Sequence, residues 1–146
     1  MAIITQVQGT RTALTNSTLP TLVSAAYAPS AAYNANTNKP LDVIVEITAA
    51  STNVVAGNKQ LALFLVESLD GTNFQTGATS TTDESNATFL GTLPLPVSTT
   101  PQTKSFSVYA ALGFIPQQFK VIVKNDLGVA LTSGTLFTAE ITGASA

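Results

Sequence analysis

The sequence has no cysteine, no histidine and no tryptophan, and these absences narrow the chemistry that the chain can perform. Without cysteine it can form neither a disulfide framework nor a reactive thiolate. Without histidine it lacks the commonest general base and the commonest transition-metal ligand, so one chain cannot build a Ser-His-Asp triad or a typical zinc site. We therefore expect a protein that is not an enzyme and that uses no cofactor and no metal.

Charged side chains are also scarce. Six basic and eight acidic residues make up 10% of the 146 residues, against about 25% in an average globular protein. The polar surface must come instead from Thr, Ser, Asn and Gln, which carry no net charge, and such a surface suits permanent packing against neighbouring subunits. The six basic residues are scattered along the chain, so we do not expect them to form a basic surface that contacts the phosphate backbone of a nucleic acid. Nucleic acid is therefore not an expected partner.

Long apolar runs are missing as well. No segment approaches the roughly 18 continuous apolar residues that a transmembrane helix needs. The first residues, MAIITQVQGTRTALTN, have neither a basic start nor the long apolar stretch of a secretory signal. The expectation is a soluble protein made in the cytoplasm, with no membrane partner.

Residues 1–40 differ from the rest of the chain. They carry two charges, Arg11 and Lys39, and neither a helical nor a strand-like hydrophobic period persists in them. Their apolar content is too high for a solvated tail, so we expect an extended N-terminal arm that docks on its own sheet or on a neighbouring subunit. The residues expected to make the contacts of this arm are Ile3, Ile4, Val7, Leu19, Leu22, Val23, Tyr27 and Tyr33.

Residues 41–146 have the patterns of an all-β domain. In residues 41–48 (LDVIVEIT) one face is apolar and most of the other is polar. Residues 60–68 (QLALFLVES) are apolar on both faces, which predicts a central strand that is covered on both faces by its own chain or is covered by a partner chain. Residues 104–112 (KSFSVYAAL) are also expected to be a strand, with a brief turn over residues 108–114 (VYAALGF) as the alternative. About eight short antiparallel strands, separated by Gly and Asn turns, predict a β-sandwich or jelly roll.

The alternation also predicts which side chains are buried. The expected core consists of Val43, Val45, Ile47, Leu63, Leu65, Phe106, Val108, Phe119, Val121, Val123, Phe137 and Ile141. The side chains expected to point outward are Lys120, Lys124, Thr138 and Glu140.

The stretch VESLDGTNFQTG, residues 66–77, runs from a strand into a turn. Asp70 and Gly71 are expected to reverse the chain, since an Asp side chain bonds the backbone two residues on and Gly tolerates a positive φ. Phe74 is expected to re-enter the core and to set the register of the returning strand. A calcium loop is the alternative, but the alternating Asp and Asn residues with a distal Glu are absent.

Two segments, ESLDGTNFQTG (residues 67–77) and KSFSVYAALGFIPQQFKVIVKNDLG (residues 104–128), together resemble small β-sandwich structural proteins of tailed-bacteriophage virions. In those proteins a strand ending in Ser-x-Asp-Gly-Thr-x-Phe or Tyr is followed later by Phe/Tyr-x-Val-x-Val-x-Asn and a Gly turn. A similar pattern occurs in discoidin-like carbohydrate-binding sandwiches.

The resemblance implies a capsid decoration (cement) protein that lies on the virion surface, binds the major capsid protein of the assembled shell and bridges neighbouring capsid subunits. The alternative is a glycan-binding or adhesion module of a phage tail or fibre, and a further alternative is a tail-tube or connector subunit. The low charge and the strand apolar on both faces predict a homo-oligomer. The resemblance favours a trimer over a dimer, because a trimer matches the local threefold positions of an icosahedral shell.

Overall fold

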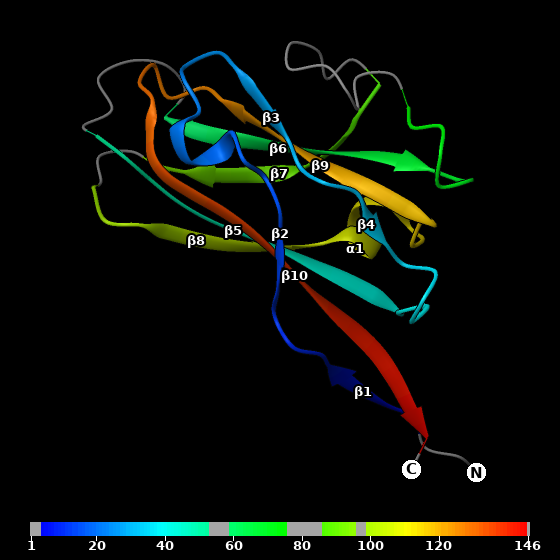
Figure 1. The fold of residues 1–146 in the computed structure, drawn as a ribbon. Helices are drawn as coiled ribbons and strands as arrows, with labels where there is room; N and C mark the ends of the chain where they lie inside the picture. Colours follow the sequence, from blue (N-terminus) through cyan, green and yellow to red (C-terminus); the bar gives the residue numbers. More distant parts are fainter. Residues whose placement is uncertain (1–3, 53–58, 76–85, 96–98, 146) are drawn as a thin grey trace.

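The computed structural model of the protein describes residues 4–52, 59–75, 86–95 and 99–145. In these residues the chain forms ten strands, arranged in two antiparallel sheets that face each other, as Figure 1 shows. The predicted all-β, sandwich-like fold is therefore confirmed, with ten strands instead of about eight.

Each sheet consists of four strands in a row and one short extra strand. Sheet A has the order β1-β10-β5-β8, and β2 also pairs with β10. Its strands are β1 (Ile4–Gln8), β2 (Thr12–Leu14), β5 (Asp42–Ser51), β8 (Gln102–Ser107) and β10 (Leu131–Ser145). Sheet B has the order β3-β9-β6-β7, and β4 also pairs with β9. Its strands are β3 (Tyr27–Pro29), β4 (Tyr33–Asn34), β6 (Gln60–Ser68), β7 (Thr88–Pro94) and β9 (Gln118–Asn125). The connections include a 3-10 turn, η1 (Leu19–Thr21), and a short helix, α1 (Val108–Leu112).

The core lies between the two sheets and is built from every second side chain of the central strands. Fully burying one Val, Leu or Phe side chain stabilises the fold by about 1.5–3 kcal/mol relative to leaving it exposed, so these residues dominate the packing energy. The predicted core residues that are buried are Val43, Val45, Ile47, Leu63, Leu65, Val108, Phe119, Val121 and Val123. Phe106 is partly buried and packs against the same cluster.

Strand β6 is central in sheet B, between β9 and β7, as its sequence predicts. Its inward side chains belong to the core, and Val66 on its outward face is also fully buried, together with Ile122 of β9. The partly buried side chains that cover this second cluster are Tyr27, Phe64, Phe74 and Ala87. The apolar residues of β6 are therefore covered on both faces by the chain itself.

The predicted facing of β10 is wrong. Leu136 pairs with the core residue Ile47, and directly opposite residues in an antiparallel pair point to the same side. Leu136 and Thr138 therefore point into the core and are 2% and 5% exposed. Phe137 and Ile141 point to the outer face of sheet A and are only partly buried. Leu136 and Phe137 are adjacent and both apolar, so alternation alone did not show which of them faces inward.

The strand predicted for residues 104–112 ends at Ser107, where α1 begins. The Ser107 side chain accepts a hydrogen bond from Ala110 N–H at 2.9 Å, and Gly113 ends the helix in the left-handed conformation at φ 78°. Gly113 N–H donates to the carbonyl of Tyr109 at 2.7 Å. A Ser N-cap and a Gly C-cap are ordinary helix signals.

Most of the segment expected to be an arm lies on the sheets of its own chain. β2 pairs with β10, and β3 and β4 pair with β9. Leu19 is fully buried against Gly134, where an added Cβ would lie 2.8 Å from Leu19 Cγ.

β1, by contrast, pairs with the last residues of β10, from Ile141 to Ser145, and this two-stranded unit extends beyond both sheets (Figure 1). We call Ile4–Gln8 together with Ile141–Ser145 the terminal ribbon.

Candidate functional site

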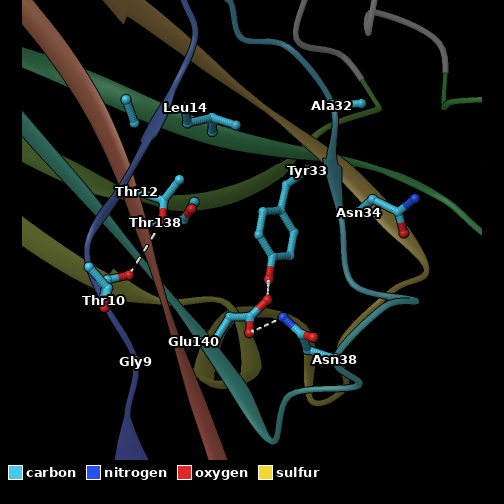
Figure 2. Close-up of a pocket in the computed structure, with 11 residues that line it drawn as sticks. Gly9, Thr10, Thr12, Leu14, Ala32, Tyr33, Asn34, Asn38, Thr138 and Glu140 are labelled. Atoms are coloured by element: carbon cyan, nitrogen blue, oxygen red, sulfur yellow. Dashed lines mark hydrogen bonds between the residues drawn. The ribbon is translucent and has the colours of Figure 1, made fainter.

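A pocket of about 420 Å³ opens between β2, at an edge of sheet A, and β4, at an edge of sheet B. β2 lines one side with Thr12, and β4 lines the other with Tyr33 and Asn34, as Figure 2 shows. Strand β10 contributes Thr138 and Glu140. The pocket is therefore built by two N-terminal strands and by β10, which is more than 90 residues further along the chain.

Glu140 is the centre of the polar contacts in this pocket. Its Oε1 accepts a hydrogen bond from the Tyr33 hydroxyl, and its Oε2 accepts one from Asn38 Nδ2 at 2.8 Å (Figure 2). Burial, and then the hydrogen bond and the charge of Glu140, raise the pKa of Tyr33 well above its ordinary value. Tyr33 therefore stays neutral and donates to the carboxylate.

The local fold explains this arrangement. Glu140 shares the inward face of β10 with Leu136 and Thr138, so the prediction that Thr138 and Glu140 point outward is wrong for the same reason as the facing of Phe137. Tyr33 lies opposite Phe119 of β9, and the two ring centroids are 5.0 Å apart. An aromatic pair at this distance contributes about 0.5–1.5 kcal/mol beyond its buried area, which holds the Tyr33 ring in place.

The side chains that line the pocket can form hydrogen bonds with a ligand. Each carboxylate oxygen of Glu140 already accepts one bond and keeps a second lone pair. Thr10, Thr12 and Asn34 add hydroxyl and amide groups around it. This set of groups suits the hydroxyl groups of a neutral ligand.

Two other kinds of site are not found in the residues that the structure describes. These residues contain no cluster of three or more Asp and Glu side chains that could hold a metal ion. None of their helices is both long enough and apolar enough to cross a membrane.

Asp70 closes the turn that follows β6. Its Oδ1 accepts hydrogen bonds from the backbone N–H of Asn73 at 2.7 Å and of Thr72 at 2.9 Å, and its Oδ2 accepts one from Asn73 Nδ2 at 2.7 Å. These bonds hold the pKa of Asp70 well below its usual range. Gly71 has φ +76°, a conformation that a residue with a Cβ adopts only at a cost.

Phe74 does not enter the core that lies between the two sheets. It forms an isolated bridge with Ser68 and packs beside Val66 and Ile122 on the outer face of sheet B. Ser68 and Val66 share the outward side of β6 because they are two residues apart, and this places Phe74 on that side. Asp70, Gly71 and Phe74 thus form a turn that covers sheet B from outside.

The predicted contact residues of the arm fall into three environments. The buried ones are Leu19 and Leu22, the partly buried ones are Tyr27 and Tyr33, and the exposed ones are Val7 and Val23. Ile3 and the side chain of Ile4 lie outside the described part of the chain. Among the described arm residues, Val7 and Val23 are therefore the ones that present large apolar surface to a partner, at 45% and 59% exposure.

Two further exposed apolar side chains lie where the terminal ribbon leaves the sandwich. Leu41 N–H donates to the carbonyl of Ile141 at 2.7 Å, which places Leu41 at the base of the ribbon. The next residue, Asp42, accepts a hydrogen bond from Tyr109 N–H at 2.9 Å, which brings Tyr109 close. Leu41 is 49% exposed and Tyr109 is 53% exposed. We call these two residues the basal pair.

Comparison of the sequence with protein-family models finds no match, and comparison with curated protein sequences finds none. The functional interpretation therefore depends on the residues and the geometry of this chain.

Proposed function

We propose that the protein is a structural subunit of a tailed-bacteriophage virion, of the capsid decoration type. In this proposal it binds the major capsid protein of the assembled shell, bridges neighbouring capsid subunits and associates with further copies of itself. The phage assignment comes from the sequence resemblance, and the assembly role is supported by the structure of the terminal ribbon.

The terminal ribbon is the observation that carries the assembly role. A two-stranded β unit without further cover is only marginally stable in water. Here Thr5, Gln6, Val7 and Gln8 are all exposed, and the described chain packs no third strand against this part of β1. A ribbon of this kind gains stability when a neighbouring subunit pairs with it or covers it.

The surroundings of the ribbon favour the same role. The basal pair adds exposed apolar surface next to it, and no charged residue lies among Ile4–Gln8 or Ile141–Ser145. The centres of protein interfaces are depleted in charged residues, because charges lose their hydration on burial. This end of the molecule therefore has the composition of a contact surface.

The proposal is tested on virions of the phage that encodes the protein. Purified particles should contain the protein in a fixed ratio to the major capsid protein, and an electron cryo-microscopy map should place the sandwich on the outer surface of the head. Absence from the particles, or a location only in the tail, would overturn it.

A deletion tests the part played by the ribbon. Removal of residues 1–8 should leave a folded sandwich, as judged by circular dichroism, but should weaken co-sedimentation with capsids lacking the protein. Leu69→Ser is the matched control, because Leu69 is 76% exposed and lies on the turn after β6. Undiminished capsid binding by the deletion variant would contradict a role for the ribbon.

A second candidate function is glycan binding by a phage adhesion module, and the pocket around Glu140 is the observation that favours it. Its carboxylate, amide and hydroxyl groups match the hydroxyl groups of a sugar. A glycan array probed with the wild-type protein and with Glu140→Gln separates the two functions. Binding that is lost in Glu140→Gln would favour the adhesion module, and no binding to any glycan would reject it.

A further inference from the structure

We infer that β1 is a self-pairing edge: two copies of the chain join by antiparallel hydrogen bonding of Ile4–Gln8 to the same segment of a second copy, with Gln6 on the twofold axis. The inference rests on the proposed assembly role and names the partner of the terminal ribbon.

The hydrogen bonds around the ribbon define which backbone groups of β1 are free. Gly9 N–H donates to the carbonyl of Glu140 at 2.7 Å, so these two residues are a hydrogen-bonded pair. Hydrogen-bonded and non-bonded pairs alternate along an antiparallel ladder, so the next pair, Gln8 with Ile141, is non-bonded. The carbonyl of Ile141 indeed points the other way, where it accepts the bond from Leu41 N–H.

The same alternation continues to the end of β1. Thr5 and Val7 direct their N–H and C=O groups toward β10, whereas Ile4, Gln6 and Gln8 direct theirs away from it. No strand of the described chain pairs with this outward side. The edge therefore presents three residues with free backbone donors and acceptors.

Three other edge strands carry residues that disfavour strand addition, and the two remaining ones, β2 and β4, have only three and two residues, too short to pair well with another chain. β3 contains Pro29, β7 contains Pro94 and β8 contains the exposed Lys104. Proline lacks the N–H donor, and a charged side chain disfavours edge-to-edge pairing, so both protect sheet edges. The β1 sequence, Ile-Thr-Gln-Val-Gln, contains neither a proline nor a charge.

This contrast indicates a second copy as the occupant. A strand of another copy that approached β3, β7 or β8 would meet a proline or a lysine. The β1 strand of that copy has neither, so two β1 strands can approach each other without such a barrier. Self-pairing about a twofold axis places identical residues near one another, which is unfavourable for charged strands. The neutral β1 avoids that repulsion.

The free backbone groups also determine the register. With Gln6 on the axis, Gln6 faces Gln6 of the second copy, and Ile4 faces Gln8. Every outward N–H and C=O group of β1 then has a partner. Moving the axis to Ile4 or Gln8 leaves some of these groups unpaired, so the central register is the most stable one.

The contact is small, and this decides how it must be measured. Pairing of two five-residue strands buries much less than the roughly 1,200 Å² of a standard stable interface. The free dimer is therefore expected to be weak. Copies held side by side on a shell would pair at a much higher effective concentration.

A single cysteine traps the contact. The chain contains no cysteine, so Gln6→Cys in the full-length protein introduces one thiol. Hydrogen-bonded residues that face each other have Cα atoms about 5.5 Å apart, within the range that a disulfide spans. Mild oxidation should therefore convert Gln6→Cys to a covalent dimer on a non-reducing gel.

Two matched variants test the register. Gln8→Cys lies on the same exposed strand, but its thiol and that of the second copy would be about 14 Å apart along the strands in the proposed register. Leu69→Cys reports random collisions of an exposed thiol. Gln6→Cys should dimerise at least about tenfold faster than either, because only its thiols are within bonding distance. Equal rates for the three variants, or faster dimerisation of Gln8→Cys, would overturn the inference.

A proline tests the same contact without a covalent bond. Gln6→Pro removes an outward N–H and leaves the ladder to β10 intact, so it should abolish self-association in sedimentation velocity at high protein concentration while circular dichroism is unchanged. Oligomers, trimers included, that persist in Gln6→Pro would overturn self-pairing through β1 and leave the assembly role standing. Dimerisation of Gln6→Cys in a protein that is absent from virions would instead support the contact and refute the proposed function.

Discussion

Replacement of Gly91 by Ala should destabilise the protein by forcing apart the two sheets where their edges meet. Gly91 lies on β7, and a Cβ added to it would lie 2.3 Å from Cε1 and 2.7 Å from Cδ1 of Phe106, on β8 of the opposite sheet. Carbon atoms do not approach this closely, so the ring must move. The neighbouring residues bind the same two edges together, because Lys104 Nζ donates to the carbonyl of Thr92 at 2.8 Å.

The expected loss has two parts. Overpacking against an ordered ring costs about 1–3 kcal/mol. Gly91 also has φ +157°, a conformation that residues with a Cβ rarely adopt, which adds about 1 kcal/mol or more. Phe106 is only partly buried and can rotate in part, so we expect a total loss of about 2–4 kcal/mol in the free energy of unfolding. Urea titration followed by circular dichroism measures it, with an unchanged m-value as evidence that only stability has changed.

Two controls isolate the ring contact. Gly113 also has a positive φ, in the left-handed region at 78°, but a Cβ there would meet nothing within 4 Å, so Gly113→Ala shows what a positive φ costs without a steric contact. In a double-mutant cycle, Gly91→Ala should cost at least about 1 kcal/mol less in a Phe106→Ala background than in the wild type. An equal loss in both backgrounds would refute the steric reasoning.

Three further predictions concern the core, the pocket and the turn. Phe119→Ala should lower the free energy of unfolding by about 3–5 kcal/mol because the ring is fully buried, and a loss below about 1 kcal/mol in urea titration would contradict its packing role. The pKa of Tyr33 is raised in the folded state, so its contribution to stability is present below the unfolded pKa of about 10 and is lost as the pH rises through the folded value. Thermal unfolding should thus show a steeper loss of stability above pH 10 in the wild type than in Tyr33→Phe; identical profiles would count against the Tyr33–Glu140 contact. The pKa of Asp70 is lowered in the folded state, so its contribution is present above the unfolded pKa of about 3.9 and is lost as the pH falls. Asp70→Ala should therefore be less stable than the wild type at neutral pH, with the difference shrinking in strong acid, and a pH-independent difference would refute the role of the carboxylate.

The central strands could be predicted because their own side chains decide their environment. Val43, Val45 and Ile47 alternate with more polar residues on β5, and the period of two leaves one way to bury them. On β6 both faces are apolar, so the sequence predicts that other residues bury both faces, but it does not show which residues these are. The cover came from Phe74 and other side chains of the same chain.

The facing of β10 and the polar pocket could not be read in this way. Leu136 and Phe137 offer equally apolar choices, and pairing with Ile47 decides between them. Tyr33 and Glu140 are separated by 107 residues, so no local spacing brings them together. Helix α1 did leave a signal in Ser107 and Gly113, but the alternation before it suggested a longer strand.

The pairing of the earliest described strand with the latest one also sets conditions on biosynthesis. Ile4 pairs with Ser145, and Tyr27 pairs with Lys124, so the N-terminal strands have no partners until β9 and β10 have left the ribosome. β5 and β6, although consecutive, belong to different sheets and must also wait for later strands. A topology dominated by such distant contacts folds slowly and exposes unpaired apolar strands meanwhile. We therefore expect nascent chains that stall before β9 to be substrates for chaperones.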